Sequence, residues 1–180
     1  EWSNGNVGLY GKSYEGATQW EAALAGNPYL KTIVPISGTT STKTLLFKNG
    51  SAEARSQVMH GAYFINIVDF DESDGDHVCP DVADGFTRGE RTYLEPRIDP
   101  DMNYWNERDY RQRSVDNYQG SVYFVQGLQD WNVDSHMIFP LYQQMKDAGF
   151  DVKGMFGQWG HDYPDQWQKH DDINKDNGGT

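Results

Sequence analysis

A glycine-rich stretch, "GNVGLYGKSYEGATQW" (residues 5–20), has residue types that build either a phosphate-binding loop or a nucleophile elbow. Both are tight turns between a strand and a helix. A phosphate-binding loop requires a glycine five residues before the glycine of the Gly-Lys-Ser unit, and Asn6 stands there. The elbow requires a serine flanked by small residues. Gly11, Ser13 and Gly16 supply them, with one residue more than the usual Gly-x-Ser-x-Gly spacing. Ser13 is therefore a candidate nucleophile that needs a base and an acid.

Candidates for the acid and the base follow two later apolar segments. Asp130 follows "SVYFVQG" (121–127), and His161 follows "DVKGMFG" (151–157). Reactive residues of open α/β sheets lie beyond the carboxyl ends of the strands, so Ser13, Asp130 and His161 are predicted to converge. An imidazole that a carboxylate orients can take the proton of a serine hydroxyl. The backbone N–H of Tyr14, at the start of the following helix, is predicted to face the developing oxyanion.

Each of these residues also has a purely structural interpretation. Ser13 could be a turn residue, Asp130 a loop cap and His161 a surface residue with satisfied hydrogen bonds. Two further carboxylates compete with Asp130 for the role of acid. We expect Asp134 to cap the helix that follows it. We expect the side chain of Asp162 to point elsewhere, because it adjoins His161 in the sequence.

The elements that must position these residues are indicated by hydrophobic pattern. Apolar runs predict buried strands, and their alternation with a helix predicts parallel crossovers. Gly26 is predicted to close the first helix, and Pro140 to bend the last one or delay its start. The predicted strands are 6–11, 30–38, 121–127 and 151–157, the predicted helices are 13–26 and 135–148, and 39–60 is expected to be partly helical. The fold class is α/β, the C-terminal half of a parallel sheet with flanking helices.

The chain is predicted to divide into three segments. Residues 1–54 carry the elbow strand, its helix and the next strand, and residues 113–180 carry the acid and histidine loops and a polar tail. Residues 55–112 form an irregular, cap-like insertion with an acidic centre. In the acidic stretch 69–81, Asp74 stands where a calcium loop needs glycine. His77 and Cys79 are too few for a zinc site. We therefore expect a solvated lid loop, no metal and no cofactor.

The net charge and the composition exclude several classes of binding partner. The net charge of −12 argues against nucleic acid or an anionic membrane as a partner. It fits either an ordinary acidic protein or adaptation to high salt, where repulsion between surface carboxylates is screened. The single cysteine, Cys79, allows no intrachain disulfide. No apolar run is long enough to span a membrane, and no signal peptide is visible, so we expect a cytoplasmic location.

Four segments resemble the X-prolyl dipeptidyl-peptidase and cocaine-esterase group of serine α/β-hydrolases: "WSNGNVGLYGKSYEG", "LKTIVPISG", "VQGLQDWNV" and "GQWGHDYP". "GKSY" and "DWNV" are closest to the X-prolyl dipeptidyl-peptidase branch. In that family the elbow has Ser-Tyr and a glycine three residues after the serine, as Gly16 is here. The resemblance is strong around the three loops and weak over 55–100. It implies that Ser13 is the nucleophile, Asp130 the triad acid and His161 the base.

The resemblance implies a serine hydrolase that works through an acyl-enzyme, with peptide or acyl substrates. A peptidase that releases X-Pro dipeptides from peptide N-termini is favoured. An ester or acyl-amide hydrolase and a catalytically idle binding or oligomerisation domain stay open, as does a homo-oligomer. Family members are longer, with a larger cap, a jelly-roll domain and an oxyanion-hole tyrosine before the elbow, so we expect a core fragment or a reduced relative. Glu15, often apolar in the family, is interpreted as a first-turn acid rather than a ligand for a substrate ammonium.

Overall fold

The computed structural model describes residues 2–48, 51–52 and 103–166, and the chain divides into two compact units. The first comprises Glu1–Ser41 and Asp109–Thr180, and the second comprises Thr42–Arg108. Ser13, Asp130 and His161 all belong to the first unit. Most of the predicted insertion lies outside the described residues, as do Asp74, His77 and Cys79. The three-segment division therefore stays a prediction.

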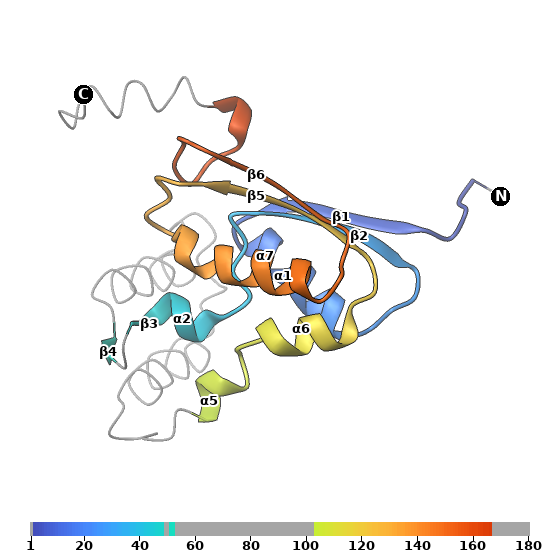
Figure 1. Ribbon diagram of the computed structural model, residues 1–180, viewed down its shortest axis with the longest axis horizontal. Coiled ribbons are helices and arrows are strands. Elements are labelled where there is room, and N and C mark those ends of the chain that lie inside the picture. Colours follow the sequence, from blue (N-terminus) through green and yellow to red (C-terminus); the bar gives the residue numbers. More distant parts are fainter. Residues whose placement is uncertain (1, 49–50, 53–102, 167–180) are drawn as a thin grey trace, which may run out of the picture. The chain divides into compact units, whose positions relative to one another are not determined.

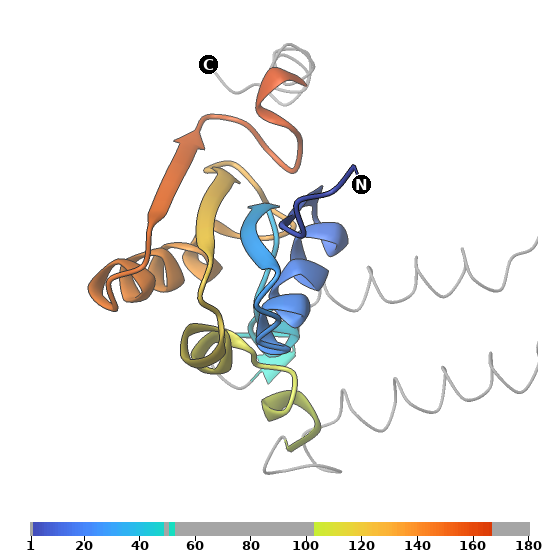
Figure 2. The ribbon, with the colours of Figure 1, turned by 90° about the vertical axis from the view of Figure 1, so that its right-hand side faces the viewer.

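The first unit is built on a four-stranded parallel sheet of order β1-β2-β5-β6 (Figure 1). The arrows of β2, β5 and β6 point the same way in Figure 2, so the carboxyl ends lie at one edge. All four strands were predicted from apolar runs, and the α/β class with parallel strands and flanking helices is confirmed. Their bounds are Val7–Lys12 (β1), Leu30–Ile36 (β2), Ser121–Gly127 (β5) and Val152–Gly157 (β6).

Three helices of the first unit lie together on one side of this sheet in Figure 1: α1 (Tyr14–Leu24), α6 (Arg111–Asn117) and α7 (Phe139–Asp147). α1 packs on β1 and β2, α7 packs on β6, and α6 contacts both helices. Trp20 of α1 is fully buried, and its ring lies 5.5 Å from that of Phe124 in β5. Gly26, with φ +61°, ends α1 as expected. No helix in the described part of the chain is long and apolar enough to cross a membrane.

The opposite side of the sheet is covered at its carboxyl end by the segment after β6. We call residues 158–163 the histidine loop. Trp159 of this loop is buried against Ile36 of β2 and Val125 of β5, and Tyr163 packs on the same cluster. The loop that carries the candidate base is therefore anchored on the strands that end beside the candidate nucleophile and acid.

The predicted helix 135–148 is divided in two. A single 3₁₀ turn spans Ser135–Met137, and α7 begins at Phe139, with Pro140 in its first turn. Proline is favoured there because the first-turn amides have no intrahelical acceptor and its fixed φ suits a helix. The expectation that Pro140 delays the start of the helix is confirmed.

The range 39–60 is expected to be partly helical, and its described residues contain a short helix in the second unit. The helix α2 covers only Thr42–Leu46, and the antiparallel pair β3 (Phe47–Lys48) and β4 (Ser51–Ala52) follows it. "NG" at positions 49–50 is the preferred sequence of a two-residue hairpin turn, a signal that competes with helix propensity. Residues 53–60 lie outside the described part. Leu46 and Phe47 pack with Trp105 of the short helix α5 (Asn103–Asn106).

Candidate active site

Ser13 occupies a strained turn between β1 and α1. Its φ of 61° and ψ of −120° are unusual for a residue with a side chain. Strain of this kind is characteristic of functional sites. Two backbone hydrogen bonds hold the turn: Ser13 N–H donates to the Ile36 carbonyl at 2.8 Å, and Ala17 N–H donates to the Ser13 carbonyl at 2.9 Å. Tyr14 is the first residue of α1, so its amide is one of those that lack an intrahelical acceptor.

A steric contact explains why the residue three positions after Ser13, Gly16, is a glycine. A Cβ on Gly16 would lie 2.9 Å from the Cα of Gly38, and one on Gly38 would lie 2.5 Å from the carbonyl carbon of Gly16. α1 therefore approaches the end of β2 backbone to backbone. A Cβ on Gly11 would likewise meet the Cβ of Glu15 at 2.6 Å. The elbow thus requires glycine at this spacing, which the generic Gly-x-Ser-x-Gly pattern does not include.

Gly38→Ala is expected to destabilise the fold by about 1–3 kcal/mol, because the new methyl group meets backbone atoms that cannot move aside cheaply. Urea unfolding measures the effect. The control is Gly149→Ala: Gly149 has φ +84° with no atom near its would-be Cβ, so this change carries only backbone strain, about 1 kcal/mol. If Gly38→Ala cost no more than the control, the close approach of Gly16 and Gly38 would not be the reason for glycine.

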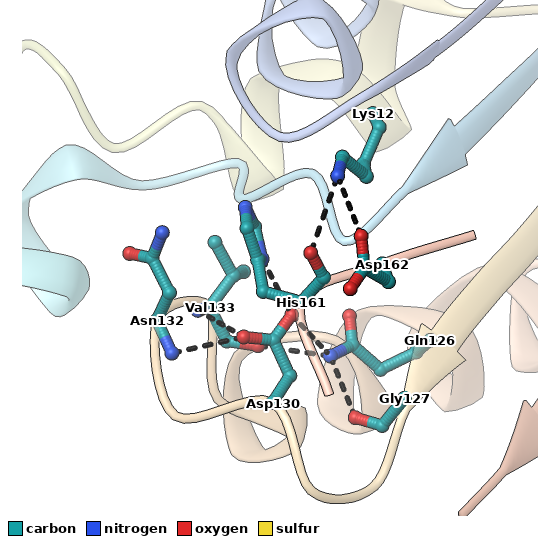
Figure 3. Close-up of polar contacts among 8 residues, drawn as sticks. All are labelled: Lys12, Gln126, Gly127, Asp130, Asn132, Val133, His161 and Asp162. Atoms are coloured by element: carbon teal, nitrogen blue, oxygen red, sulfur yellow. Dashed lines mark hydrogen bonds and ion pairs between the residues drawn. The ribbon is translucent and has the colours of Figure 1, made fainter. Parts of the chain in front are cut away.

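Asp130 presents a fully buried carboxylate on the loop after β5. Its Oδ1 accepts hydrogen bonds from the backbone N–H groups of Asn132 and Val133, both at 2.9 Å. Its Oδ2 accepts a longer bond, 3.4 Å, from Nε2 of Gln126. A buried charge is tolerated when hydrogen bonds replace its hydration, and these donors do so here. Figure 3 shows the donors gathered around the carboxylate.

His161 is joined to Asp130 by a short hydrogen bond. Its Nδ1 lies 2.8 Å from Oδ2 of Asp130, and the imidazole is largely buried, with 17% of its side chain exposed. A carboxylate only accepts, so Nδ1–H is the donor, and Nε2 of the neutral ring is left able to accept a proton. The hydrogen bond expected between these two residues is present (Figure 3).

The elbow and the histidine loop are joined through the residue before Ser13. Nζ of Lys12 lies 3.2 Å from the carbonyl oxygen of His161 and 3.3 Å from Oδ1 of Asp162 (Figure 3). Among the described residues, no hydrogen bond joins the Ser13 hydroxyl to His161. The structure thus pairs Asp130 with His161 directly and, through Lys12, joins the Ser13 turn to the histidine loop. The catalytic roles of the three residues stay a prediction.

The two competing carboxylates have other contacts. Asp134 stands at the N-cap position of the 3₁₀ turn, but its side chain makes no capping hydrogen bond, so the predicted cap is wrong. Its Oδ2 lies instead 3.7 Å from Nδ1 of His136, a contact that the sequence did not suggest. Asp162 is directed to Lys12, as expected for a side chain that does not serve the imidazole.

Sequence reasoning missed two residues of this site, Gln126 and Lys12. Gln126 is fully buried, and its Nε2 donates to the carbonyl groups of Gly127 and Val133 as well as to Asp130. Its signal was available: a polar residue at the carboxyl end of an otherwise apolar strand must find partners where it is buried. The local sequence of Lys12 indicates only a phosphate-binding pattern, although Asp162, directly after His161, is its acidic partner in the structure.

Solved structures share this architecture. An aminopeptidase from a marine-sediment Thaumarchaeota archaeon aligns with a TM-score of 0.60 and 19% identity, covering 88% of this chain and 29% of that one. Porphyromonas gingivalis dipeptidyl peptidase 4 aligns with a TM-score of 0.56 and 14% identity, covering 95% and 19%. Acetyl xylan esterase 1 from Thermoanaerobacterium aligns with a TM-score of 0.50 and 14% identity, covering 93% and 44%. At these identities the likeness shows the fold, that of α/β-hydrolases.

Sequence comparison identifies the family. The "Putative Xaa-Pro dipeptidyl-peptidase" of Rhodopirellula baltica is 30% identical over 185 residues, which cover 98% of this chain and 29% of the relative. The Xaa-Pro dipeptidyl-peptidase of Ligilactobacillus salivarius is 28% identical over 180 residues, covering 94% and 22%. The chain therefore spans less than a third of the length of these curated relatives. The model of the X-Pro dipeptidyl-peptidase (S15) family matches residues 1–163, and the chain belongs to that family.

Proposed function

We propose that this chain carries the catalytic core of a serine hydrolase that forms an acyl-enzyme at Ser13. The substrate class that we favour is peptides with proline in the second position, from which the enzyme releases an X-Pro dipeptide. The observation that carries the proposal is the 2.8 Å hydrogen bond from Nδ1 of His161 to the buried carboxylate of Asp130. It orients an imidazole whose other nitrogen is available as a base, on a loop joined to the strained turn of Ser13.

The proposed reaction begins when Oγ of Ser13 attacks the carbonyl carbon of the substrate's proline residue. Nε2 of His161 takes the hydroxyl proton, and the carboxylate of Asp130 stabilises the imidazolium that results. The tetrahedral intermediate collapses, and His161 gives the proton to the leaving amine. Water, deprotonated by His161, then attacks the ester, and the dipeptide leaves with the carboxylate while Ser13 regains its proton.

Tyr14 is the proposed source of one oxyanion donor. Its amide lies at the N-terminus of α1, where the helix dipole also favours negative charge. The charge that develops on the substrate's carbonyl oxygen during attack would lie at this position. Two parts of the site thus act in the same step: the imidazole–carboxylate pair removes the proton of Ser13, and the N-terminus of α1 stabilises the oxyanion.

Peptide specificity is supported by sequence, since the family and the relatives reported above are named for X-Pro dipeptidyl-peptidase. An ester or acyl-amide hydrolase would use the same triad and the same elbow. The difference between these functions lies in the pocket that binds the acyl group, and therefore in relative rates on two kinds of substrate.

The proposal is tested on the full-length natural protein with a fluorophosphonate probe, followed by mass spectrometry of the labelled peptide. Label on Ser13 is expected, because the probe reacts only with a serine that a base activates. Hydrolysis rates of an X-Pro-anilide and a short acyl ester then separate peptidase from esterase, and a higher kcat/KM on the anilide is expected. Absence of label on Ser13 would show an idle domain and refute the enzyme proposal.

A further inference from the structure

Lys12 makes contacts that the triad does not require. It ends β1 directly before Ser13, and its Nζ lies 3.2 Å from the carbonyl oxygen of His161 and 3.3 Å from Oδ1 of Asp162. The same ammonium lies 5.2 Å from the ring centroid of Tyr163. One side chain of the elbow strand therefore contacts three consecutive residues of the histidine loop.

The histidine loop has to cross the sheet to reach this position. β6, which it follows, and β1 lie at opposite edges of the four-stranded sheet. In Figure 2 the red segment after β6 runs back over the carboxyl ends of the neighbouring strands. Trp159 packs on Ile36 and Val125 during this crossing, and Tyr163 stacks on Tyr10 of β1 with ring centroids 6.1 Å apart. Apolar contacts thus anchor the loop on both sides of His161.

The register of the sheet explains why Lys12 can serve as the polar anchor. Lys12 pairs with Ile36, and Tyr10 pairs with Val34. Residues two apart in a strand project from the same face, and this is the face on which the histidine loop packs on Ile36 and Val34. Lys12 and Tyr10 together therefore present a cation and a ring to the loop. Of these two side chains, Lys12 contacts His161 itself, whereas Tyr10 stacks on Tyr163.

We propose that Lys12 is a positioning residue, which holds the backbone of His161 above the elbow so that its imidazole stays aligned between Asp130 and Ser13. The catalytic consequence rests on the proposed function. An ammonium only donates, and it faces a carbonyl and a carboxylate, which accept. The contact with Asp162 holds the Lys12 ammonium in place, and the hydrogen bond to the His161 carbonyl holds the backbone of His161. An ordinary surface ion pair would leave turnover unchanged, but these two side chains are only 24% and 29% exposed.

The first measurement compares Lys12→Met with wild type in the full-length protein, using an X-Pro-anilide. A small displacement of a catalytic group is costly, so kcat is expected to fall about 10- to 100-fold. KM is expected to change less than about two-fold, since Lys12 is not proposed to touch the substrate. Lys12→Arg, which keeps the charge and the donors, should restore most of kcat. The control Lys146→Met removes a lysine that lies 5.4 Å from the ring of Tyr142 on α7, and it should leave kcat unchanged.

The second measurement is amide hydrogen exchange of the histidine loop, which does not depend on turnover. The bonds to follow are Asp162 N–H to the Gly160 carbonyl, 2.9 Å, and Gln129 N–H to the Trp159 carbonyl, 3.1 Å. Exchange of the amides of residues 158–163 and of Gln129 should be faster in Lys12→Met than in wild type or Lys146→Met. Unchanged exchange with unchanged kcat would overturn the proposal, as would a raised KM at unchanged kcat. If the wild type neither turned over nor reacted with fluorophosphonate, the proposed function would fail, and exchange would still decide whether Lys12 holds the loop.

Discussion

Ser13→Ala is expected to lower kcat of the full-length enzyme by about six orders of magnitude, the loss typical of removing a serine nucleophile. No acyl-enzyme can form without Oγ, and the fluorophosphonate probe should no longer attach at this position. The fold should be unaffected, because alanine at φ 61° carries the same backbone strain as serine and the turn is held by main-chain hydrogen bonds. Anilide hydrolysis measures the loss, and a thermal unfolding curve checks the fold.

The matched control is Ser37→Ala. Ser37 also has a left-handed φ, 48°, and it follows β2 at the same edge of the sheet. Its side chain is fully buried, and its hydroxyl has no hydrogen-bond partner among the described residues. A buried serine cannot meet a substrate, so Ser37→Ala should keep wild-type turnover and labelling. Equal losses in the two variants would mean that the edge of the sheet, not the Ser13 hydroxyl, is what turnover requires.

The strands of the first unit could be predicted from sequence because their apolar, β-branched residues are typical of buried strands. "SVYFVQG" is β5 to the residue, since an apolar, β-branched run bounded by glycine is typical of a buried parallel strand. Three such strands, each followed by a polar loop, place Ser13, Asp130 and His161 at one edge of the sheet. That placement follows from topology alone, and it predicted the pairing of Asp130 with His161 without any knowledge of side-chain contacts.

Contacts between distant loops could not be predicted in the same way. Lys12 and Asp162 are 150 positions apart, and nothing in either local sequence selects one as the partner of the other. Their meeting depends on the path of the histidine loop over the sheet, which Trp159 and Tyr163 decide by packing on strands of other segments. The failed prediction for Asp134 has a related cause, because an aspartate before a helix can either cap it or contact a neighbouring histidine.

The hydrogen bonds around Asp130 determine how the side-chain amide of an asparagine would be oriented at this position. Oδ1 accepts two backbone N–H bonds, so the oxygen of a substituted amide should keep that position. Its NH₂ group must then replace Oδ2 and face Nδ1 of His161. Two donors cannot share a hydrogen bond, so Nδ1 has to become an acceptor and the ring proton moves to Nε2. A ring in that tautomer cannot take the proton of Ser13.

Asp130→Asn is therefore expected to lower kcat by about four orders of magnitude with little change in KM, as the same exchange does in serine proteases. The measurement is anilide hydrolysis by the full-length enzyme, with circular dichroism to show that the fold is kept. Asp134→Asn is the matched control: Asp134 lies on the same loop, contacts His136 rather than His161, and should keep kcat within about two-fold. Asp162→Asn should cause a partial loss of kcat, since Lys12 would keep its hydrogen bond to the His161 carbonyl. If Asp134→Asn or Asp162→Asn abolished turnover while Asp130→Asn did not, Asp130 would not be the acid of the triad.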